Sequence, residues 1–245
     1  MTQPDVIAPG VNILAAWTSF ASPTDLDIDP RRVDFNIISG TSMSCPHVNG
    51  LEALPRQAHP DWSPAAIKSA LMTTAYNTDN SDGVIHDLAN GKESTPFVHG
   101  AGHIDPNRSL DPGLQVGDYI SFHCTNGYSP LQIAVFVKDL AVDCSGKEMV
   151  SPGDLNYPSF SVVFDPHNKV VTYRRTVKNV GSTQAGEISE PNQTRSYSVT
   201  FSTVRDPVKA SATVAFGSIT WKDGVHVVRS SVAFQWTSAG LVSAM

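Results

Sequence analysis

The sequence is poor in charge and has no long apolar run. Charged residues make up 16% of the 245 residues, against about 25% in an average soluble domain. The basic clusters do not exceed the pairs Arg31-Arg32 and Arg174-Arg175, and the formal net charge is -6, so we expect no nucleic-acid partner. The longest apolar stretch, the interrupted run 131–142, is too short to span a bilayer, and we expect no membrane partner.

Cysteine is also scarce. The three cysteines, Cys45, Cys124 and Cys144, are too few for a disulfide scaffold and odd in number. Histidines and carboxylates do not cluster at the spacings of metal ligands, so we expect neither a metal nor another cofactor. The first residues, "MTQPDVIAPGVNILAAW", have neither the basic region nor the unbroken apolar core of a secretory signal, and we expect no signal peptide in this chain.

The residues that are present divide the chain into two parts. Up to about Tyr119, helical patterns alternate with loops rich in Gly and Pro. After about Leu155, short alternating runs of Val, Thr, Tyr and Phe indicate β-strands. The runs cover residues 169–180, 195–202, 217–221 and 225–236. Between the last two, Asp223-Gly224 predicts a two-residue hairpin turn, because Gly readily adopts positive φ.

The stretch "HPDWSPAAIKSALMTTA", residues 59–75, gives the best helix signal. Ser63 can cap the first turn and Pro64 fits the first helical position. One apolar face recurs at helical spacing and is expected to be buried: it comprises Ile67, Ala70, Leu71 and Ala75.

A second helix is predicted from about Ser42 to about Gln57. Pro55 would remove the hydrogen bond to the Leu51 carbonyl, so we expect this helix to kink or stop near Leu54.

The start of that second helix, "IISGTSMSCPHVNG" at 37–50, contains three serines. A serine nucleophile needs a general base. His47 is the tempting candidate, but five residues along a helix place it about 140° from Ser42 around the axis. No histidine precedes Ser42. We expect structural, hydrogen-bonded roles for His59, His99 and His103, and the loop carboxylates Asp25, Asp27, Asp29 and Asp34 have no histidine to orient.

Longer strings give these residues a context. "SGTSMSCPHVNG" followed by "HPDWSPAAIKSALMTTA" resembles the nucleophile region of the subtilisin-like serine proteases, and specifically the plant subtilases. The resemblance extends to "PDVIAPGVNILAAW" before it and "TPFVHGAGHIDPNRSLDPGL" after it. "LNYPSFSV", "RRTVKNVG" and "SITWKDGVHVVRSSV" resemble the fibronectin-III-like domain at the C-terminus of that family.

The resemblance implies a catalytic role for Ser42. It would be the nucleophile of a serine endopeptidase that hydrolyses protein or peptide substrates through an acyl-enzyme, and its backbone N–H would be one oxyanion donor. Ser39 and Ser44 are then structural, Ser44 at a position that needs a small side chain. Cys45 is expected to be buried beneath the site.

The same resemblance implies that part of the site is missing. Subtilases carry the acid and the base in the order Asp, His, Ser, with the asparagine oxyanion donor also before the serine. The catalytic Asp and His are thus absent from this chain, whose partner would be the missing N-terminal half of the peptidase domain. In subtilisin itself, loss of the histidine costs on the order of a millionfold in turnover, so we expect the chain alone to be inactive.

The implied fold is the C-terminal part of an α/β subtilisin-like domain, at residues 1–122, followed by a connector at 123–153. A fibronectin-III-like β-sandwich follows at 154–237, and residues 238–245 form a tail. A seven-strand sandwich takes about 100 residues, so we expect an incomplete one with about five strands and an unpaired edge. Without the upstream sheet we expect residues 1–120 to be unstable and readily cut by proteases.

The family's extracellular location implies two further features. Asn107 and Asn192 stand in glycosylation acceptor triplets, and Cys124 and Cys144 could close a disulfide in an oxidising compartment. The alternative to a protease fragment is a non-catalytic truncated homologue that acts as a binding or interfering module. A free-standing adhesion sandwich would not explain the intact serine string.

Overall fold

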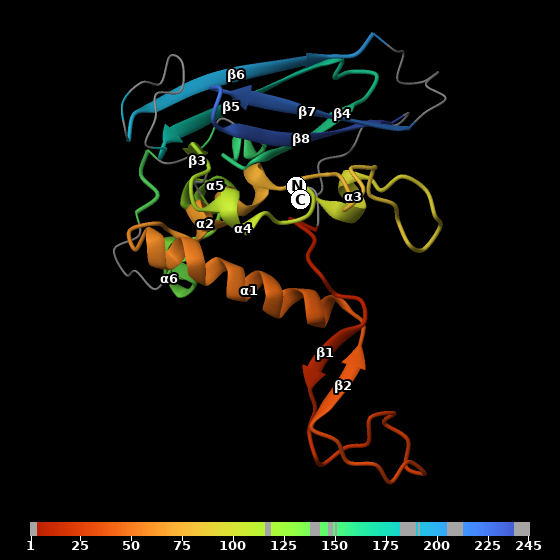
Figure 1. The fold of residues 1–245 in the computed structure, drawn as a ribbon. Coiled ribbons are helices and arrows are strands. Elements are labelled where there is room, and N and C mark those ends of the chain that lie inside the picture. Colours follow the sequence, from red (N-terminus) through yellow and green to blue (C-terminus); the bar gives the residue numbers. More distant parts are fainter. Residues whose placement is uncertain are drawn as a thin grey trace.

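The structure, a computed structural model, describes residues 4–115, 119–137, 143–146, 149, 151–181, 190, 192–204 and 213–237. The expected tail at 238–245 lies outside these residues. A β-sandwich forms one side of the molecule, a layer of helices lies against it, and a long helix and a two-stranded hairpin lie beyond that layer (Figure 1).

The sandwich consists of two three-stranded sheets, ordered β3-β5-β6 and β4-β8-β7. Strand β4 runs parallel to β8, whereas the other neighbours are antiparallel. Within the described part of 154–237 there are five strands, the number expected, and β6 and β7 have a described neighbour on one side only. The strands are β4 (Ser159–Phe164), β5 (Val170–Asn179), β6 (Thr194–Ser202), β7 (Val214–Lys222) and β8 (Val227–Trp236).

The sandwich core is aromatic. Phe160, Phe164 and Val232 are almost fully buried, and partly buried side chains of β5, β6 and β7 pack against them. The rings of Phe160 and Phe201 meet edge to face with centroids 5.7 Å apart, a favourable arrangement for two aromatic rings.

Two features of the sandwich differ from the sequence pattern. The turn between β7 and β8 has four residues, 223–226, instead of two, because Lys222 pairs with Val227; Gly224 has the positive φ that the turn requires, 96°. Strand β3 (Leu114–Gln115) comes from the first part of the chain and pairs with the end of β5. A strand of two residues has no pattern that a sequence can reveal.

Helix α2 (Pro64–Thr74) begins as predicted: Ser63 Oγ accepts a hydrogen bond from the Ala66 N–H, and Pro64 is the first helical residue. Eight of its 11 residues are buried. It packs against Val48 of the helix that precedes it and directly against β8 of the sandwich; the contact with β8 was not predicted. The predicted face is buried, with Ala70 at 0% exposure and Leu71 at 3%.

Helix α1 (Thr41–Ala58) lies on the side of α2 away from the sandwich (Figure 1). It runs through Pro55 to Ala58, so it does not stop near Leu54, one of the two outcomes predicted there. One intrahelical bond is lost at Pro55, but the His59 N–H donates to the Pro55 carbonyl at 2.9 Å and closes the last turn. Pro55 is also the buried residue of α1, and burial of its ring offsets part of that loss.

The N-terminal segment and several short helices complete the described structure. The N-terminal segment 5–7 runs beside 101–104, where the Ile7 N–H donates to the Gly102 carbonyl and the Ile104 N–H to the Ile7 carbonyl. Lys68 of α2 forms an ion pair with Asp5 at 2.7 Å. The short helices are α3 (Pro96–His99), α4 (Pro106–Ser109), α5 (Tyr119–Thr125), α6 (Pro130–Val137) and the 3₁₀ helix η1 (Pro152–Asp154).

The hairpin of β1 (Ile13–Ala16) and β2 (Phe35–Ile38) extends away from this body (Figure 1). Its apolar side chains are open to solvent: Leu14 is 67% exposed and Ile37 63%. Solvent-exposed apolar side chains on a two-stranded ribbon contribute little to its stability. We therefore expect this hairpin to be the first part of the chain to open.

Limited proteolysis tests this expectation. Trypsin should cut first after Arg31 or Arg32, both exposed in the loop that joins β1 to β2, while 41–115 stays docked on the sandwich. Mass spectrometry of the early fragments identifies the cuts. Early cleavage after Lys68, within α2, would contradict the packing described above.

A disulfide joins Cys124 of α5 to Cys144, with Cα atoms 5.5 Å apart and a sequence separation of 20. Such a cross-link restricts the unfolded chain. Replacing both cysteines with serine should lower the free energy of unfolding by about 3 kcal/mol, measured by urea denaturation without reductant. Thiol titration of the denatured wild type should find one free thiol, Cys45, and a count of three would exclude the bridge.

Candidate active site

Ser42 is the second residue of α1 and is exposed. No side chain caps this helix, and its first turn holds no acidic residue. Within the described residues, the N–H groups of Thr41 and Ser42 and the Ser42 hydroxyl form no hydrogen bond. The positive end of the helix dipole is therefore open beside the Ser42 hydroxyl, and it favours negative charge there.

The segment Ala8–Asn12 holds this helix start in place. The Gly40 N–H donates to the Gly10 carbonyl at 2.8 Å, Ser44 Oγ donates to the Ala8 carbonyl at 3.1 Å, and the Asn12 N–H donates to Ser39 Oγ at 2.8 Å. A Cβ at Gly10 would come within 2.1 Å of Ser44 Oγ. Ser39 and Ser44 thus have the structural roles expected of them, and Ser42 is the serine that stays free.

The histidines considered as bases are engaged elsewhere. His47 Nδ1 lies 2.7 Å from the Met43 carbonyl, and His59 Nε2 lies 2.8 Å from the Leu110 carbonyl while its ring stacks on Trp62. His103 Nδ1 is 3.0 Å from the Ile104 carbonyl. The hydrogen bonds expected of His59 and His103 are thus present.

His99 is buried, and its Nδ1 contacts Ser94 Oγ at 3.0 Å. Burial, assisted by the charge of Arg229, lowers its pKa, so the ring is neutral at neutral pH.

A cavity of about 630 Å³ lies beside the site. His47 and Tyr76 line it together with His103, Asp105 and apolar residues of α1, but Ser42 does not. The described residues contain no cluster of three or more histidines, cysteines or carboxylates that could hold a metal ion.

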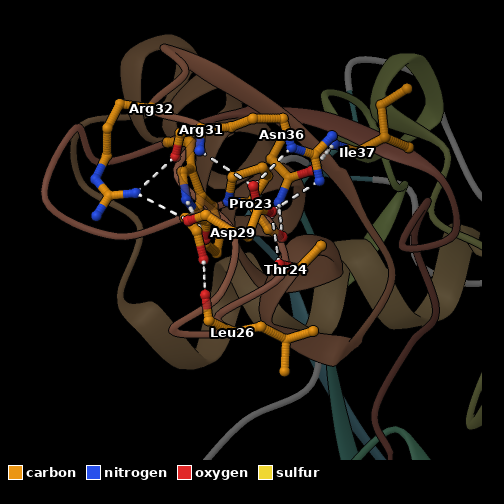
Figure 2. A network of polar contacts seen from close by, with 10 residues as sticks. Pro23, Thr24, Leu26, Asp29, Arg31, Arg32, Asn36 and Ile37 are labelled. Atoms are coloured by element: carbon orange, nitrogen blue, oxygen red, sulfur yellow. Dashed lines mark hydrogen bonds and ion pairs between the residues drawn. The ribbon is translucent and has the colours of Figure 1, made fainter.

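The carboxylates considered as the acid lie in the loop between β1 and β2, at the end of the hairpin remote from α1 (Figure 1). Figure 2 shows that Asp29 organises this loop by accepting hydrogen bonds from Arg31 and Thr24. Those bonds, Arg31 first, hold the pKa of Asp29 well below its usual range. Asp29 therefore serves the loop and has no histidine to orient.

Cys45 corrects an expectation: it is exposed and free, not buried. In the described residues no element covers the face of α1 that carries it.

A titratable cluster that sequence reasoning missed lies elsewhere, where His226 meets Asp111 and Asp223. Only the short spacing of Asp223 and His226 could have indicated it.

Known protein families match both parts of the chain. Residues 1–102 match the family model described as the Subtilase family. Residues 154–186 and 187–234 match that of a Fibronectin type-III domain. The open serine on α1 thus lies in a subtilase segment, and the sandwich in a fibronectin type-III segment.

The chain also matches individual subtilisin-like proteases over nearly its whole length. The chain is 53% identical to subtilisin-like protease SBT1.4 of Arabidopsis thaliana over 98% of its own length and 35% of the relative's. It is 49% identical to SBT1.7 of the same plant over 96% of its length and 34% of the relative's. A solved structure of MycP1 without its propeptide covers 42% of this chain and 27% of MycP1, at 27% identity and a TM-score of 0.26.

The chain belongs to the plant subtilisin-like protease family. It spans about a third of the length of the relatives it matches, 35% and 34% for the two above.

The contacts of Ser44 and Ser42 predict that replacing each with alanine changes the free energy of unfolding by different amounts. Ser44→Ala removes the hydrogen bond to the half-buried Ala8 carbonyl and should cost about 1 kcal/mol of unfolding free energy. Ser42→Ala removes no contact and should stay within about 0.5 kcal/mol of wild type. Urea denaturation of both variants measures the difference, and an equal loss in the two would disprove these roles.

Proposed function

We propose that this chain supplies the nucleophile and one oxyanion donor of a serine endopeptidase. The observation that carries the proposal is the exposed, unbonded Ser42 at the open N-terminus of α1, inside the segment that matches the Subtilase family. In this role Ser42 Oγ attacks the carbonyl carbon of a peptide bond in a protein or peptide substrate. The Ser42 backbone N–H then stabilises the negative charge that develops on the carbonyl oxygen.

In this proposal the catalytic Asp and His come from outside the described residues. No hydrogen bond between Ser42 and a histidine is present in the part of the chain that the structure describes, His47 and His59 contact backbone carbonyls, and Asp29 accepts hydrogen bonds from Arg31 and Thr24. A serine without its histidine loses on the order of a millionfold in turnover in subtilisin. We therefore propose that these 245 residues alone do not hydrolyse peptides.

The surface next to Ser42 supports a partner in the rest of a peptidase domain. Leu14, Phe35 and Ile37 on the β1–β2 hairpin and Leu54 on α1 are exposed, and they form apolar surface of the kind that another segment covers. The relatives are about three times as long as the matched region, which is 35% of the first of them. The same surface supports the alternative function, in which the chain alone is a binding or interfering module.

We propose an extracellular location, by analogy with the family. None of the helices in the described ranges is long and apolar enough to cross a membrane. Asn192 and Thr194 of one acceptor triplet are both exposed, whereas in the other Asn107 is exposed and Ser109 fully buried. In the folded chain Asn192 is therefore the more accessible site for a glycan.

A chimera tests the catalytic proposal. Residues 1–237 would replace the matching part of SBT1.4, so that upstream residues of that relative complete the domain. A phosphonate that modifies active serines should label the chimera at Ser42 and should not label the isolated chain. Ser42→Ala should abolish both labelling and peptide hydrolysis, whereas the control Ser81→Ala, at an exposed serine remote in sequence from α1, should keep both.

Two outcomes would contradict the proposal. Labelling of Ser42 in the isolated chain would show that the chain supplies its own base. A chimera that melts cooperatively but remains unlabelled would remove Ser42 from the role of nucleophile. In that case, binding of the isolated chain to the upstream segment of SBT1.4, measured by calorimetry, would favour the binding module.

A further inference from the structure

His226 connects the fibronectin type-III segment to residues that follow the segment matching the Subtilase family. It lies in the turn between β7 and β8, and its side chain is only 8% exposed. Its Nδ1 lies 2.7 Å from Asp223 Oδ2 in the same turn. Its Nε2 lies 3.1 Å from Oδ2 of Asp111, which follows α4 in the first part of the chain. One imidazole thus lies between carboxylates that are far apart in the sequence.

Backbone atoms of two glycines lie close to the imidazole ring of His226. A Cβ at Gly113 would come within 2.9 Å of the His226 ring, and one at Gly181 within 3.3 Å. Asp223 is held by the turn itself, because its Oδ1 accepts the N–H groups of Val225 and His226. The ring therefore has little room to turn away from Asp111 beside these two glycines.

The other charged groups on this interface face backbone. Arg108 of α4 donates from Nη2 to the Val227 carbonyl at 2.9 Å. Arg229 of β8 donates from Nη1 to the Ala101 carbonyl at 3.1 Å. These two hydrogen bonds also join residues 101–108 to strand β8. The guanidinium groups that donate them stay protonated over the pH range in which a histidine titrates, so these bonds do not change with His226.

The protonation state of His226 decides whether its contact with Asp111 is attractive. In the neutral ring, Nδ1–H can donate to Asp223, and Nε2 then presents a lone pair to a second carboxylate. In the protonated ring both nitrogens carry a proton, and each faces a negative charge. Binding a proton therefore converts a repulsive contact between the segments into an ion pair.

We propose that His226 is a proton-dependent clasp that fastens the β7–β8 turn of the fibronectin type-III segment to the residues after α4 and releases them as the solution becomes alkaline.

The pKa directions agree with this geometry. Burial lowers the pKa of His226, but the carboxylates of Asp223 and Asp111 outweigh it, and the net result is a raised pKa. For Asp223 burial acts in the opposite direction and raises the pKa. Hydrogen bonds from the His226 side chain and the backbone outweigh burial and lower the pKa of Asp223 to about 2. Because the folded pKa of His226 exceeds its unfolded value, the clasp stabilises fully below about pH 6.5 and its contribution disappears as the pH rises through the folded pKa.

NMR titration of the full chain tests the proposal. The Cε1–H resonance of His226 can be assigned by its absence from the His226→Gln variant. We expect its midpoint to lie above the ordinary histidine value of about 6.5 and to fall in Asp111→Asn. That substitution keeps the size of a half-exposed side chain, so the variant should fold. The exposed His167 provides the control, because His167→Gln should leave the His226 midpoint unchanged.

Stability measurements give an independent readout. In urea denaturation, wild type and His167→Gln should lose stability as the pH rises through the His226 midpoint, and His226→Gln should lack that loss. A His226 midpoint at or below the ordinary value would overturn the proposal. So would a midpoint that is unchanged in Asp111→Asn, or a pH profile of His226→Gln that overlays wild type.

Discussion

Helix α2 is buried against strand β8, and this contact connects the two halves of the molecule. Both elements carry buried small side chains: Ser69 and Ala70 on the helix have 0% exposure, and Ser231 on the strand has 1%. Backbones that approach closely exclude water over a large area and so gain packing energy. Helix α1 then packs on the far face of α2 through Val48, and β8 holds β4 on its other edge.

The start of α1 is held independently of the rest of a peptidase domain. Backbone and hydroxyl contacts from Ala8–Asn12 fix the turn before Ser42, while Ser42 itself bonds to nothing in the described residues. The segment thus presents a positioned hydroxyl and open amides. Positioning and proton transfer are separate contributions to catalysis, and in the proposed function these residues supply the first while an upstream histidine supplies the second.

Features of the fold and of the candidate site that depend on short sequence motifs were predictable from the sequence. The cap at Ser63, the turn at Gly224 and the position of Ser42 each depend on a few neighbouring residues. Features set by tertiary contacts were not predictable. Pro55 is tolerated because its ring is buried, Cys45 is exposed because nothing described covers it, and Leu114–Gln115 is a strand only because β5 lies beside it. Asp111 and His226 meet through the packing of two segments, which spacing cannot reveal.

Strand β8 is the last described strand of the chain, and it completes three contacts at once: with α2, with β4 and with β7. Strand β4 buries Phe160, Val162 and Phe164 together with Val232 of β8, so its apolar face stays incompletely packed until Val227–Trp236 has been synthesised. Contacts between such distant residues form slowly, because the loop must close before they stabilise anything. A ribosome making this chain would therefore carry the sandwich in an incompletely packed state until β8 has been synthesised and has paired with β4 and β7.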